Sequence, residues 1–481
     1  MRRIAIHNRT GSTLSHVHLL GIGGAAMAPV AGLLKESGYR VTGSDTGVYP
    51  PASTLLKSLR IRWNEKFDAA NLKPAPDLAV VGNVIARGNP EVEHILEEKI
   101  PYCSMAQLLE DLFIAQHNSI VVAGTHGKTT TTAMLAWIFH VARKRPSFLV
   151  GGVLPNFDDR SYALGTGDDF IIEGDEYETA FFDRGPKFLH YRPDQLVITS
   201  LEYDHADIYP NLESIAHQFR LLVNLVPRTG RVVVWGESKE VLACAEKAFC
   251  PVETFGASEG MDWFAAGIKW ENNSTHFQVK YRGRTVAHIR LPMAGRHNVL
   301  DALAAVAVAH GRGIRSEAIE KAMAGFQGVR KRMEIKGEAG GVIVVEDFAH
   351  HPTAMRVTIE AARTRWPHRK LWVAFEPRSN TMRRKVFEDV LPEALSGADA
   401  VMIGPVNRAN LLSDAERISP QRIAMELAAR GKESATFGSA AEIAQHIAGA
   451  AGAGDLVLVM SNGSFDGLSM KLLDLLENHK G

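Results

Sequence analysis

Short apolar runs alternate with amphipathic helical patterns along most of the chain. The run HVHLL (16–20) is followed by AAMAPVAGLLKESG (25–38), whose apolar spacing and final glycine predict a helix. Further strands are predicted at 39–45 and 77–83, and the polar stretch 46–73 is expected to be mostly loop and short helix. Strands that alternate with helices form parallel sheets, so the pattern predicts an α/β fold.

A second series begins with SIVVAG (119–124) and a helix at about 128–142, and strands follow at FLVGG, DFIIEGD, QLVITS and RVVVWG. Residues 263–292 instead predict an antiparallel meander without intervening helices. After the polar, basic linker FQGVRKRME (326–334) the α/β rhythm returns. We therefore expect three domains, at 1–115, 116–328 and 329–481.

Composition narrows the class of protein. With 481 residues, the chain is too long for one ordinary core, and its 54 basic residues cancel its 54 acidic ones. The chain therefore has no net charge that would attract it to nucleic acid or to an anionic membrane. In addition, no apolar run approaches the ~18 residues of a membrane span. Three cysteines without C-x-x-C spacing suit a reducing compartment. The opening MRRIAIHNRT has too short an apolar stretch for a signal peptide, so we expect a cytoplasmic protein.

The strongest local signal is VVAGTHGKTTTT (121–132), in which a buried-type strand leads through glycines into a helix. Glycine turns and a helix N-terminus present backbone N–H groups to a polyphosphate. Lys128 is expected to reach the terminal phosphates and Thr129 to hold Mg²⁺, although the spacing is shorter than the common G-x-x-x-x-G-K-[ST] form. The predicted phosphate contacts are Gly124, Thr125, His126, Gly127, Lys128, Thr129 and Thr130.

A second glycine loop, GIGGAAM (21–27), also follows a strand and opens a helix. Asp45 ends the next strand, where an acid that binds a ribose would lie. Read alone, this loop suggests an NAD(P)-dependent oxidoreductase, another phosphorylated ligand, or only tight helix packing. The predicted contacts are Gly21, Ile22, Gly23, Gly24, Ala25 and Asp45.

Acids and histidines follow several predicted strands directly, at the sheet edge where functional groups gather. These clusters are Glu173, Asp175 and Glu176; Asp204, His205 and Asp207; and Asp347, His350 and His351. Because Mg²⁺ favours oxygen ligands and substrate phosphates, Glu173 suits a metal next to a nucleotide, with His205 as a further ligand. We therefore predict Thr129, Glu173 and His205 as the metal site.

Two groups near helix and domain boundaries complete the set. His297 and Asn298 stand at a helix start, where Asn298 either caps the helix or also meets a nucleotide base. Arg330 lies in the basic linker, which is either a solvated hinge or the source of an arginine that reaches the phosphates on domain closure.

These pieces, in this order, resemble the Mur ligase family, ATP-dependent amide-bond-forming enzymes that build peptidoglycan precursors. The resemblance spans the chain and rests on GIGGAAM, GTHGKTT, EGDE, EYDHAD, GRHN, VRKRME and DFAHHP. It implies a Rossmann-like first domain for UDP-N-acetylmuramate (UDP-MurNAc), a central P-loop ATPase-like domain, and a Rossmann-like last domain for a peptide. It also implies catalytic roles for Lys128, Glu173, His205, Arg330, Asp347 and His351, and ATP contacts for His297, Asn298, Arg330 and Asp347.

DFAHHP and GRHN resemble the branch of the family that uses UDP-MurNAc directly. In that branch, two candidates remain for the amine that is joined to UDP-MurNAc. One is L-alanine, used in new peptidoglycan synthesis, and the other is the tripeptide L-Ala-γ-D-Glu-meso-diaminopimelate, used in peptidoglycan recycling. GSDTGVYPPASTLL, RGNPEVE, EYETAFFDRGPKFLHYRP and FEPRSNTMRRKVF resemble the tripeptide-joining members. The expected substrates are UDP-MurNAc, ATP and the murein tripeptide, with Arg378, Asn380 and Thr381 as peptide contacts.

One departure from the family pattern concerns the metal. Several Mur ligases carry a carbamylated lysine about fourteen residues after the motif histidine, where this chain has Phe219. Any second Mg²⁺ must therefore be held differently. Two other classes stay open: the oxidoreductase above, which leaves GTHGKTT unexplained, and a protein that binds ATP to control an interaction without synthesis.

Overall fold

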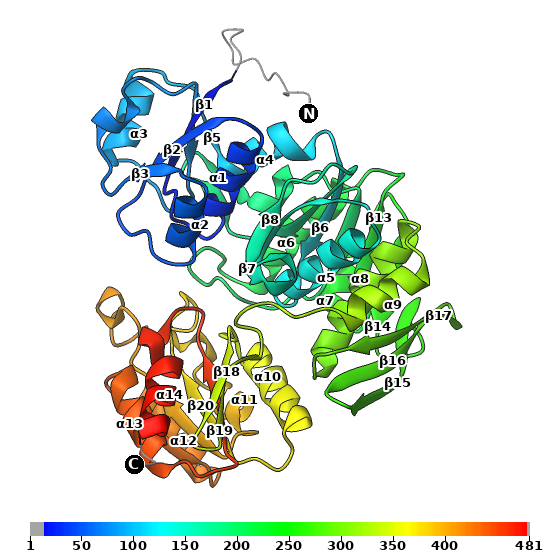
Figure 1. Ribbon diagram of the computed structural model, residues 1–481, viewed down its shortest axis with the longest axis vertical. Coiled ribbons are helices and arrows are strands. Elements are labelled where there is room, and N and C mark those ends of the chain that lie inside the picture. The colour runs from blue at the N-terminus through cyan, green and yellow to red at the C-terminus, as the bar shows by residue number, and fades with distance from the viewer. Residues whose placement is uncertain (1–13, 479–481) are drawn as a thin grey trace.

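Three large sheets organise the described residues, one for each α/β unit that the sequence predicts (Figure 1). A small fourth sheet pairs β10 (Glu178–Ala180) antiparallel with β11 (Asp183–Pro186). The computed structural model describes residues 14–478. The prediction that the first ten residues are not a signal peptide therefore lies outside the described residues. The large sheets occupy 16–104, 118–291 and 334–460. These spans fall inside the three predicted domains, whose boundaries stay a prediction.

The first sheet is wholly parallel, in the order β3-β2-β1-β4-β5. Three of its strands, β1 (His16–Leu20), β2 (Arg40–Ser44) and β4 (Leu78–Val81), were predicted. The edge strands β3 (Arg62–Asn64) and β5 (Tyr102–Ser104) were not, because three residues carry no measurable alternation. The helices are α1 (Met27–Glu36), α2 (Ala52–Ser58), α3 (Pro90–Glu97) and α4 (Met105–Leu109).

The middle sheet runs β17-β16-β15-β14-β13-β12-β6-β9-β7-β8. Its parallel centre consists of β6 (Asn118–Ala123), β7 (Ser147–Leu154), β9 (Asp169–Gly174), β12 (Gln195–Ile198), β13 (Arg231–Trp235) and β14 (Val252–Gly256). The predicted antiparallel meander is confirmed as β15 (Trp263–Glu271), β16 (Ser274–Tyr281) and β17 (Arg284–Leu291). The short strand β8 (Arg160–Ala163) pairs antiparallel with β7.

Helices cover both faces of this sheet. One face carries α5 (Lys128–Val141), α8 (Arg296–Gly311) and α9 (Ser316–Ala324), whose apolar side chains join one buried cluster. The other carries α6 (Leu212–Asn224) and α7 (Lys239–Ala245). The parallel strands are almost continuously apolar because helices bury them on both sides.

The third sheet runs β18-β19-β23-β20-β21-β22. Its strands are β18 (Glu334–Ala339), β19 (Val342–Asp347), β20 (Leu371–Phe375), β21 (Ala400–Ile403), β22 (Glu433–Thr436) and β23 (Leu456–Met460). The polar edge strand β18 is the only antiparallel strand of this sheet. It is also the only strand of this sheet that the sequence did not predict. The helices are α10 (Pro352–Arg365), α11 (Leu391–Leu395), α12 (Pro420–Ala429), α13 (Ala440–Ala450) and α14 (Leu468–Asn478).

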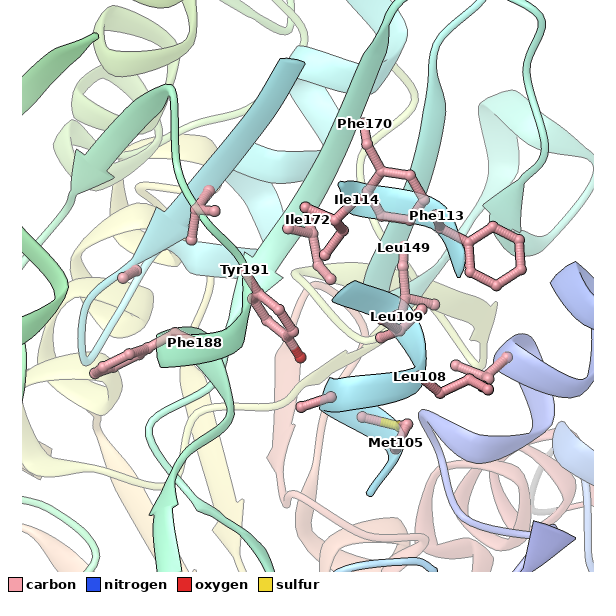
Figure 2. Close-up of a cluster of buried hydrophobic side chains, with 14 of the residues drawn as sticks. Met105, Leu108, Leu109, Phe113, Ile114, Leu149, Phe170, Ile172, Phe188 and Tyr191 are labelled. Atoms are coloured by element: carbon pink, nitrogen blue, oxygen red, sulfur yellow. The ribbon is translucent and has the colours of Figure 1, made fainter. Parts of the chain in front are cut away.

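The chain that leaves the first sheet is fixed to the middle sheet by a buried apolar cluster (Figure 2). The cluster joins two groups of side chains: α4 and the π-helical turn after it contribute Met105, Leu108, Leu109, Phe113 and Ile114, and strands β7 and β9 with the segment 187–191 contribute Leu149, Phe170, Ile172, Phe188 and Tyr191. Burial of these apolar side chains keeps water away from the connection and holds the first part of the chain near the middle part. We call the parts built on the first, middle and third sheets the first, middle and last lobes. Among residues 14–478, no helix combines the length and apolarity that crossing a membrane requires.

Candidate active site

The predicted strand-turn-helix around the phosphate loop is present, between β6 and α5. Gly124 and Gly127 have φ of +136° and +78°. A Cβ atom on Gly124 would stand 2.2 Å from Thr199 Oγ1, and one on Gly127 would stand 2.3 Å from Asp301 Oδ1. Only glycine fits both positions, and the loop delivers the chain to the N-terminus of α5, where backbone N–H groups have no intrahelical partner. Such a terminus attracts anions.

Lys128 opens α5 and forms a buried ion pair. Its Nζ lies 3.0 Å from Glu176 Oε1 and donates to the carbonyl of Gly124 at 2.5 Å. Burial lowers the pKa of Lys128, but the charges of Glu176 and Glu173 more than offset this, so its pKa is raised. The amine is therefore cationic and aimed into the loop. The sequence placed Glu176 in an acidic cluster but missed its pairing with the lysine.

Thr129 and Glu173, two of the three predicted metal ligands, lie together. Thr129 Oγ1 donates to Glu173 Oε1 at 2.9 Å, and the N–H of Gly151 donates to Glu173 Oε2 at 2.7 Å. Burial raises the pKa of Glu173 despite the nearby charge of Lys128. A hydroxyl and a carboxylate beside an anion-binding loop are a donor set that fits Mg²⁺.

His205, the third predicted ligand, contacts Glu176 rather than Glu173. Its Nε2 lies 2.8 Å from Glu176 Oε1, and its ring packs on Tyr177 with centroids 4.2 Å apart. Burial lowers the pKa of His205, but the hydrogen bond to Glu176 and the charges of Glu176 and Asp204 together more than offset this, so its pKa is raised. Lys128 and His205 thus share one carboxylate, and the role of His205 as a metal ligand stays a prediction.

The order of strands explains why these groups meet. The parallel strands β12, β6 and β9 are neighbours, and they end at Ile198, Ala123 and Gly174. Their carboxyl ends therefore lie along one edge, with the phosphate loop in the centre. The acids after β9 flank the loop on one side, and the residues after β12 flank it on the other.

At the start of α8, Asn298 does not cap the helix. The helix begins at Arg296 with Gly295 as its N-cap, and the Asn298 amide donates to the carbonyl of Ala294 at 2.7 Å. The capping alternative is therefore wrong. His297 lies beside it with a buried Nδ1 that has no hydrogen-bond partner, and burial lowers its pKa to about 4. The predicted contact of both residues with a nucleotide base stays a prediction.

Asp301, one turn further along α8, faces Gly127 of the phosphate loop and was not singled out from the sequence. It is 7% exposed, and burial raises its pKa to about 7. The folded carboxyl keeps its proton up to about pH 7, whereas in the unfolded chain it ionises above about pH 4. Unfolding therefore releases a proton between these values, and wild-type stability falls as the pH rises through that window.

We expect Asp301→Asn, which cannot ionise, to lack this decline. At pH 8 its free energy of unfolding should exceed the wild-type value by up to about 4 kcal/mol, because three pKa units correspond to about 1.36 kcal/mol each. Denaturant titrations between pH 4 and 8 measure this, and the difference should vanish near pH 4. The exposed Glu317 on α9 provides the control Glu317→Gln; if both variants follow wild type, Asp301 is ionised in the fold.

The hinge places its two arginines differently. Arg330 is 44% exposed, and its Nε and Nη2 donate to Asp159 at 2.9 and 3.0 Å, with Glu334 beside it. In this arrangement its guanidinium is not directed at the phosphate loop, and its expected contact with ATP stays a prediction. Arg332 packs over the ring of Phe348, and its charge acts on Asp301 and Asp347. Arg332 is thus a candidate that the sequence did not separate from its neighbours.

Asp347 ends β19, and hydrogen bonds hold its carboxylate. Its Oδ2 accepts the N–H of Met333, and its Oδ1 accepts the N–H of Ala349, both at 2.8 Å. Burial raises its pKa although Arg332 opposes this. Asp347 therefore connects Met333, at the end of the linker, to the start of the segment that carries His350 and His351. Its contact with ATP stays a prediction.

The last lobe contacts the middle lobe through the predicted peptide residues. The Asn380 amide donates to Asp207 at 2.7 Å, and Thr381 Oγ1 accepts the N–H of Ala206 at 3.1 Å. Both partners belong to the loop that carries His205. Arg378 is one-third exposed and donates to Glu376 at 3.2 Å. Asn380 and Thr381 thus line the side of the last lobe that faces the His205 loop, and the peptide contacts of all three residues stay a prediction.

In the first glycine loop, the N–H groups of Gly21 and Ile22 both donate to the carbonyl of Ser44. The N–H of Gly23 donates to Asp45 Oδ2 at 2.8 Å, and Ile22 is fully buried. Asp45 therefore holds the loop itself, a use that the sequence did not indicate. Gly24 and Ala25 lead to α1, where the N–H of Ala28 donates to the carbonyl of Gly24 and the N–H of Val30 donates to the carbonyl of Ala26.

Phe219 confirms that a carbamylated lysine has no place in α6. The ring is 1% exposed and packs on Phe188 with centroids 5.3 Å apart. The position belongs to the apolar core, so a charged side chain there would be buried without a partner.

Comparison with known proteins agrees with this geometry. The family model for the Mur ligase middle domain matches residues 122–309, the model for the Mur ligase glutamate ligase domain matches 331–463, and the Mur ligase family catalytic-domain model matches 16–117. Together they cover most of the chain. The protein belongs to the Mur ligase family.

Among individual relatives, UDP-N-acetylmuramate--L-alanyl-γ-D-glutamyl-meso-2,6-diaminoheptandioate ligase of Haemophilus influenzae is 38% identical over 96% of this chain and 100% of its own. The Escherichia coli protein of that name is 39% identical, covering 95% and 97%. A crystal structure of a murein peptide ligase from Psychrobacter arcticus is 35% identical, with a TM-score of 0.73 over 96% of this chain and 99% of its own. The UDP-N-acetylmuramate--L-alanine ligase of Roseiflexus is 32% identical, covering 96% and 99%.

Proposed function

We propose that this protein is an ATP-dependent ligase that joins L-Ala-γ-D-Glu-meso-diaminopimelate to UDP-MurNAc in peptidoglycan recycling. The observation that carries the proposal is the convergence of Lys128, Thr129, Glu173 and Glu176 at one phosphate loop. Similarity over nearly the full length to two relatives named for that reaction supports the choice of nucleophile. Its substrates, a nucleotide sugar and ATP, suit the cytoplasm.

In the proposed reaction, a carboxylate oxygen of UDP-MurNAc attacks the γ-phosphorus of ATP, the bond to the β-phosphate oxygen breaks, and ADP leaves. The peptide amine then attacks the acyl phosphate carbonyl; phosphate leaves and the amine loses a proton. Phosphorylation is required because oxide is a poor leaving group. The protein contributes mainly positioning and charge neutralisation.

The residues divide this work. Lys128 would leave Glu176 and neutralise γ-phosphate oxygens, while His205 keeps the buried Glu176 paired. Thr129 and Glu173 would hold Mg²⁺, which supplies positive charge to the phosphates. The first glycine loop, with Gly21–Ala25 and Asp45, would bind the UDP part through the N-terminus of α1.

An assay of ADP release with ATP and UDP-MurNAc tests the proposal directly. One reaction receives the tripeptide, a second receives L-alanine, and a third receives no amine. We expect release with the tripeptide only. Release driven by L-alanine would instead assign the protein to new peptidoglycan synthesis, and no release with either amine would reject ligase activity.

Arg378→Ala is expected to impair use of the peptide. A guanidinium matches two carboxylate oxygens, and a charged hydrogen bond contributes about 1.5–3 kcal/mol, which corresponds to about 10–100-fold. The KM for the tripeptide should rise by that factor while the KM for ATP changes little. Arg384→Ala is the matched control, because Arg384 belongs to the same segment but pairs with the exposed Glu416. A change in ATP affinity alone would contradict the assignment.

The oxidoreductase alternative finds no support in the site. The acid that it would need for a ribose, Asp45, accepts the N–H of Gly23. All three family models that match the chain are Mur ligase models.

A further inference from the structure

One cluster of side chains in the described region has no role in the proposed reaction as a group. His126 of the phosphate loop, Glu202 after β12 and His351 before α10 offer ligand atoms that all lie within 4.8 Å of one another. Within residues 14–478, this is the single group of three or more histidine, cysteine or acidic side chains that converges in this way. It joins the middle lobe to the last one.

The distances fit a transition-metal ion. Glu202 Oε2 lies 3.3 Å from His126 Nε2 and 3.5 Å from His351 Nδ1. Tetrahedral zinc with bonds of about 2.0–2.1 Å separates its ligand atoms by about 3.3 Å. Two of the three ligand–ligand distances are therefore already close to the required length, and the third, between the two histidines, is at most 4.8 Å. Two imidazoles and one carboxylate form a ligand set known for zinc sites with one open position.

Hydrogen bonds prepare His351 as a ligand. Its Nε2–H donates to the carbonyl of Tyr203 at 3.3 Å, which leaves Nδ1 without a proton and facing Glu202. A ring N–H on a backbone carbonyl is the usual support of a metal-bound histidine. Burial lowers the pKa of His351 to about 4, so the ring is neutral at pH 7. Nδ1 also accepts the N–H of Thr353 at 3.3 Å, a long contact that a metal bond would replace.

Glu202 is also held in place. Thr353 Oγ1 donates to its Oε2 at 2.7 Å, and its backbone N–H donates to Thr125 Oγ1 at 2.8 Å. Burial raises the pKa of Glu202, but His126 and Thr353 more than offset this and lower it to about 2. The group is therefore a carboxylate at pH 7, with lone pairs for both Thr353 and a cation. His126 and Glu202 are 24% and 32% exposed, which gives an ion a path from solvent.

We propose that His126, Glu202 and His351 form a site for a divalent transition-metal ion of the zinc class, which fastens the last lobe to the phosphate loop. The site differs from the proposed Mg²⁺ position at Thr129 and Glu173, whose ligands are oxygens. Because Mg²⁺ prefers six oxygen ligands, it does not compete effectively for two imidazoles. Bound zinc would restrain the loop that receives the phosphates, so it would act as a regulator of domain movement.

The test measures zinc binding by the nucleotide-free full-length protein, in competition with a chromophoric chelator and in millimolar Mg²⁺. We expect one zinc ion per chain, and at least tenfold weaker binding in each of His126→Gln, Glu202→Gln and His351→Gln. His190→Gln is the matched control, because His190 also contacts two acids, Glu110 and Asp183, but through opposite ring nitrogens. It should bind zinc like wild type.

A second measurement guards against misfolded variants. Each of the three site variants must first show a cooperative thermal transition without zinc. Zinc should then raise the Tm of wild type and of His190→Gln, and it should not change the Tm of the three site variants. Less than one zinc per chain, or equal binding by the site variants, would overturn the proposal and leave an ordinary His–Glu contact between lobes. Both measurements are independent of ligase activity, so they do not depend on the proposed reaction.

Discussion

Lys128→Met is expected to lower ADP release in the presence of UDP-MurNAc and the tripeptide by about 10²–10³-fold. Electrostatic donors aimed at developing charge have effects of this size when they are removed. In this structure the ammonium lies between Glu176 and the carbonyl of Gly124, already inside the loop, so few other movements are required for it to reach a phosphate. Steady-state kinetics with all three substrates measure the effect, and near-normal turnover would contradict our interpretation of the loop.

The same substitution should reduce stability, because it leaves the buried Glu176 carboxylate with only His205 of its two side-chain partners. Removing one member of a buried pair costs about 3–5 kcal/mol. The double variant Lys128→Met/Glu176→Gln removes both charges and should recover much of this loss while turnover stays low. That comparison separates a catalytic role of Lys128 from a merely structural one. Parallel recovery of turnover would show that the lysine acts only by keeping Glu176 paired.

Glu173→Gln is expected to cause the second large loss, also about 10²–10³-fold, because a bound metal supplies several kcal/mol of charge stabilisation. The carboxylate accepts from Thr129 and from the N–H of Gly151, so an amide of the same shape keeps the local packing. The requirement for Mg²⁺ should shift to higher concentration, which titrations of activity against Mg²⁺ measure at saturating ATP.

Glu178→Gln is the matched control for this prediction. Glu178 follows the same strand, but it forms an exposed pair with Arg184, and exposed pairs contribute little. Its Mg²⁺ titration should coincide with that of wild type. If Glu173→Gln also keeps the wild-type Mg²⁺ requirement, the metal is held elsewhere, and the donor set of Thr129 and Glu173 serves the fold only.

The prediction for Phe219 illustrates what one residue can exclude. The sequence ruled out a carbamylated lysine because the residue type cannot undergo that reaction, and the structure adds that the position is core. By contrast, the alternatives for Asn298 required the helix boundary. Because α8 begins at Arg296 and not at Asn298, Asn298 lies in the first turn of the helix instead of capping it. Its side-chain amide donates to the carbonyl of Ala294, which precedes the helix.

The sequence by itself determined the alternating α/β units, the antiparallel meander and the glycine loop before Lys128. Each of these is encoded in a few neighbouring residues, through apolar periodicity or through a backbone conformation that only glycine adopts. The short edge strands β3 and β5 and the polar strand β18 carry too little of that periodicity to be predicted.

Only the tertiary structure decided which side chains are partners. Lys128 and Glu176 are 48 residues apart, and Glu202 and Thr353 are 151 apart. They meet because β6 lies between β9 and β12 and because the last lobe is seated against the end of β12. The direction of Arg330 toward Asp159 depends in the same way on the neighbouring β7–β8 hairpin. Strand order and lobe placement are properties of the whole chain's packing, and no local pattern specifies them.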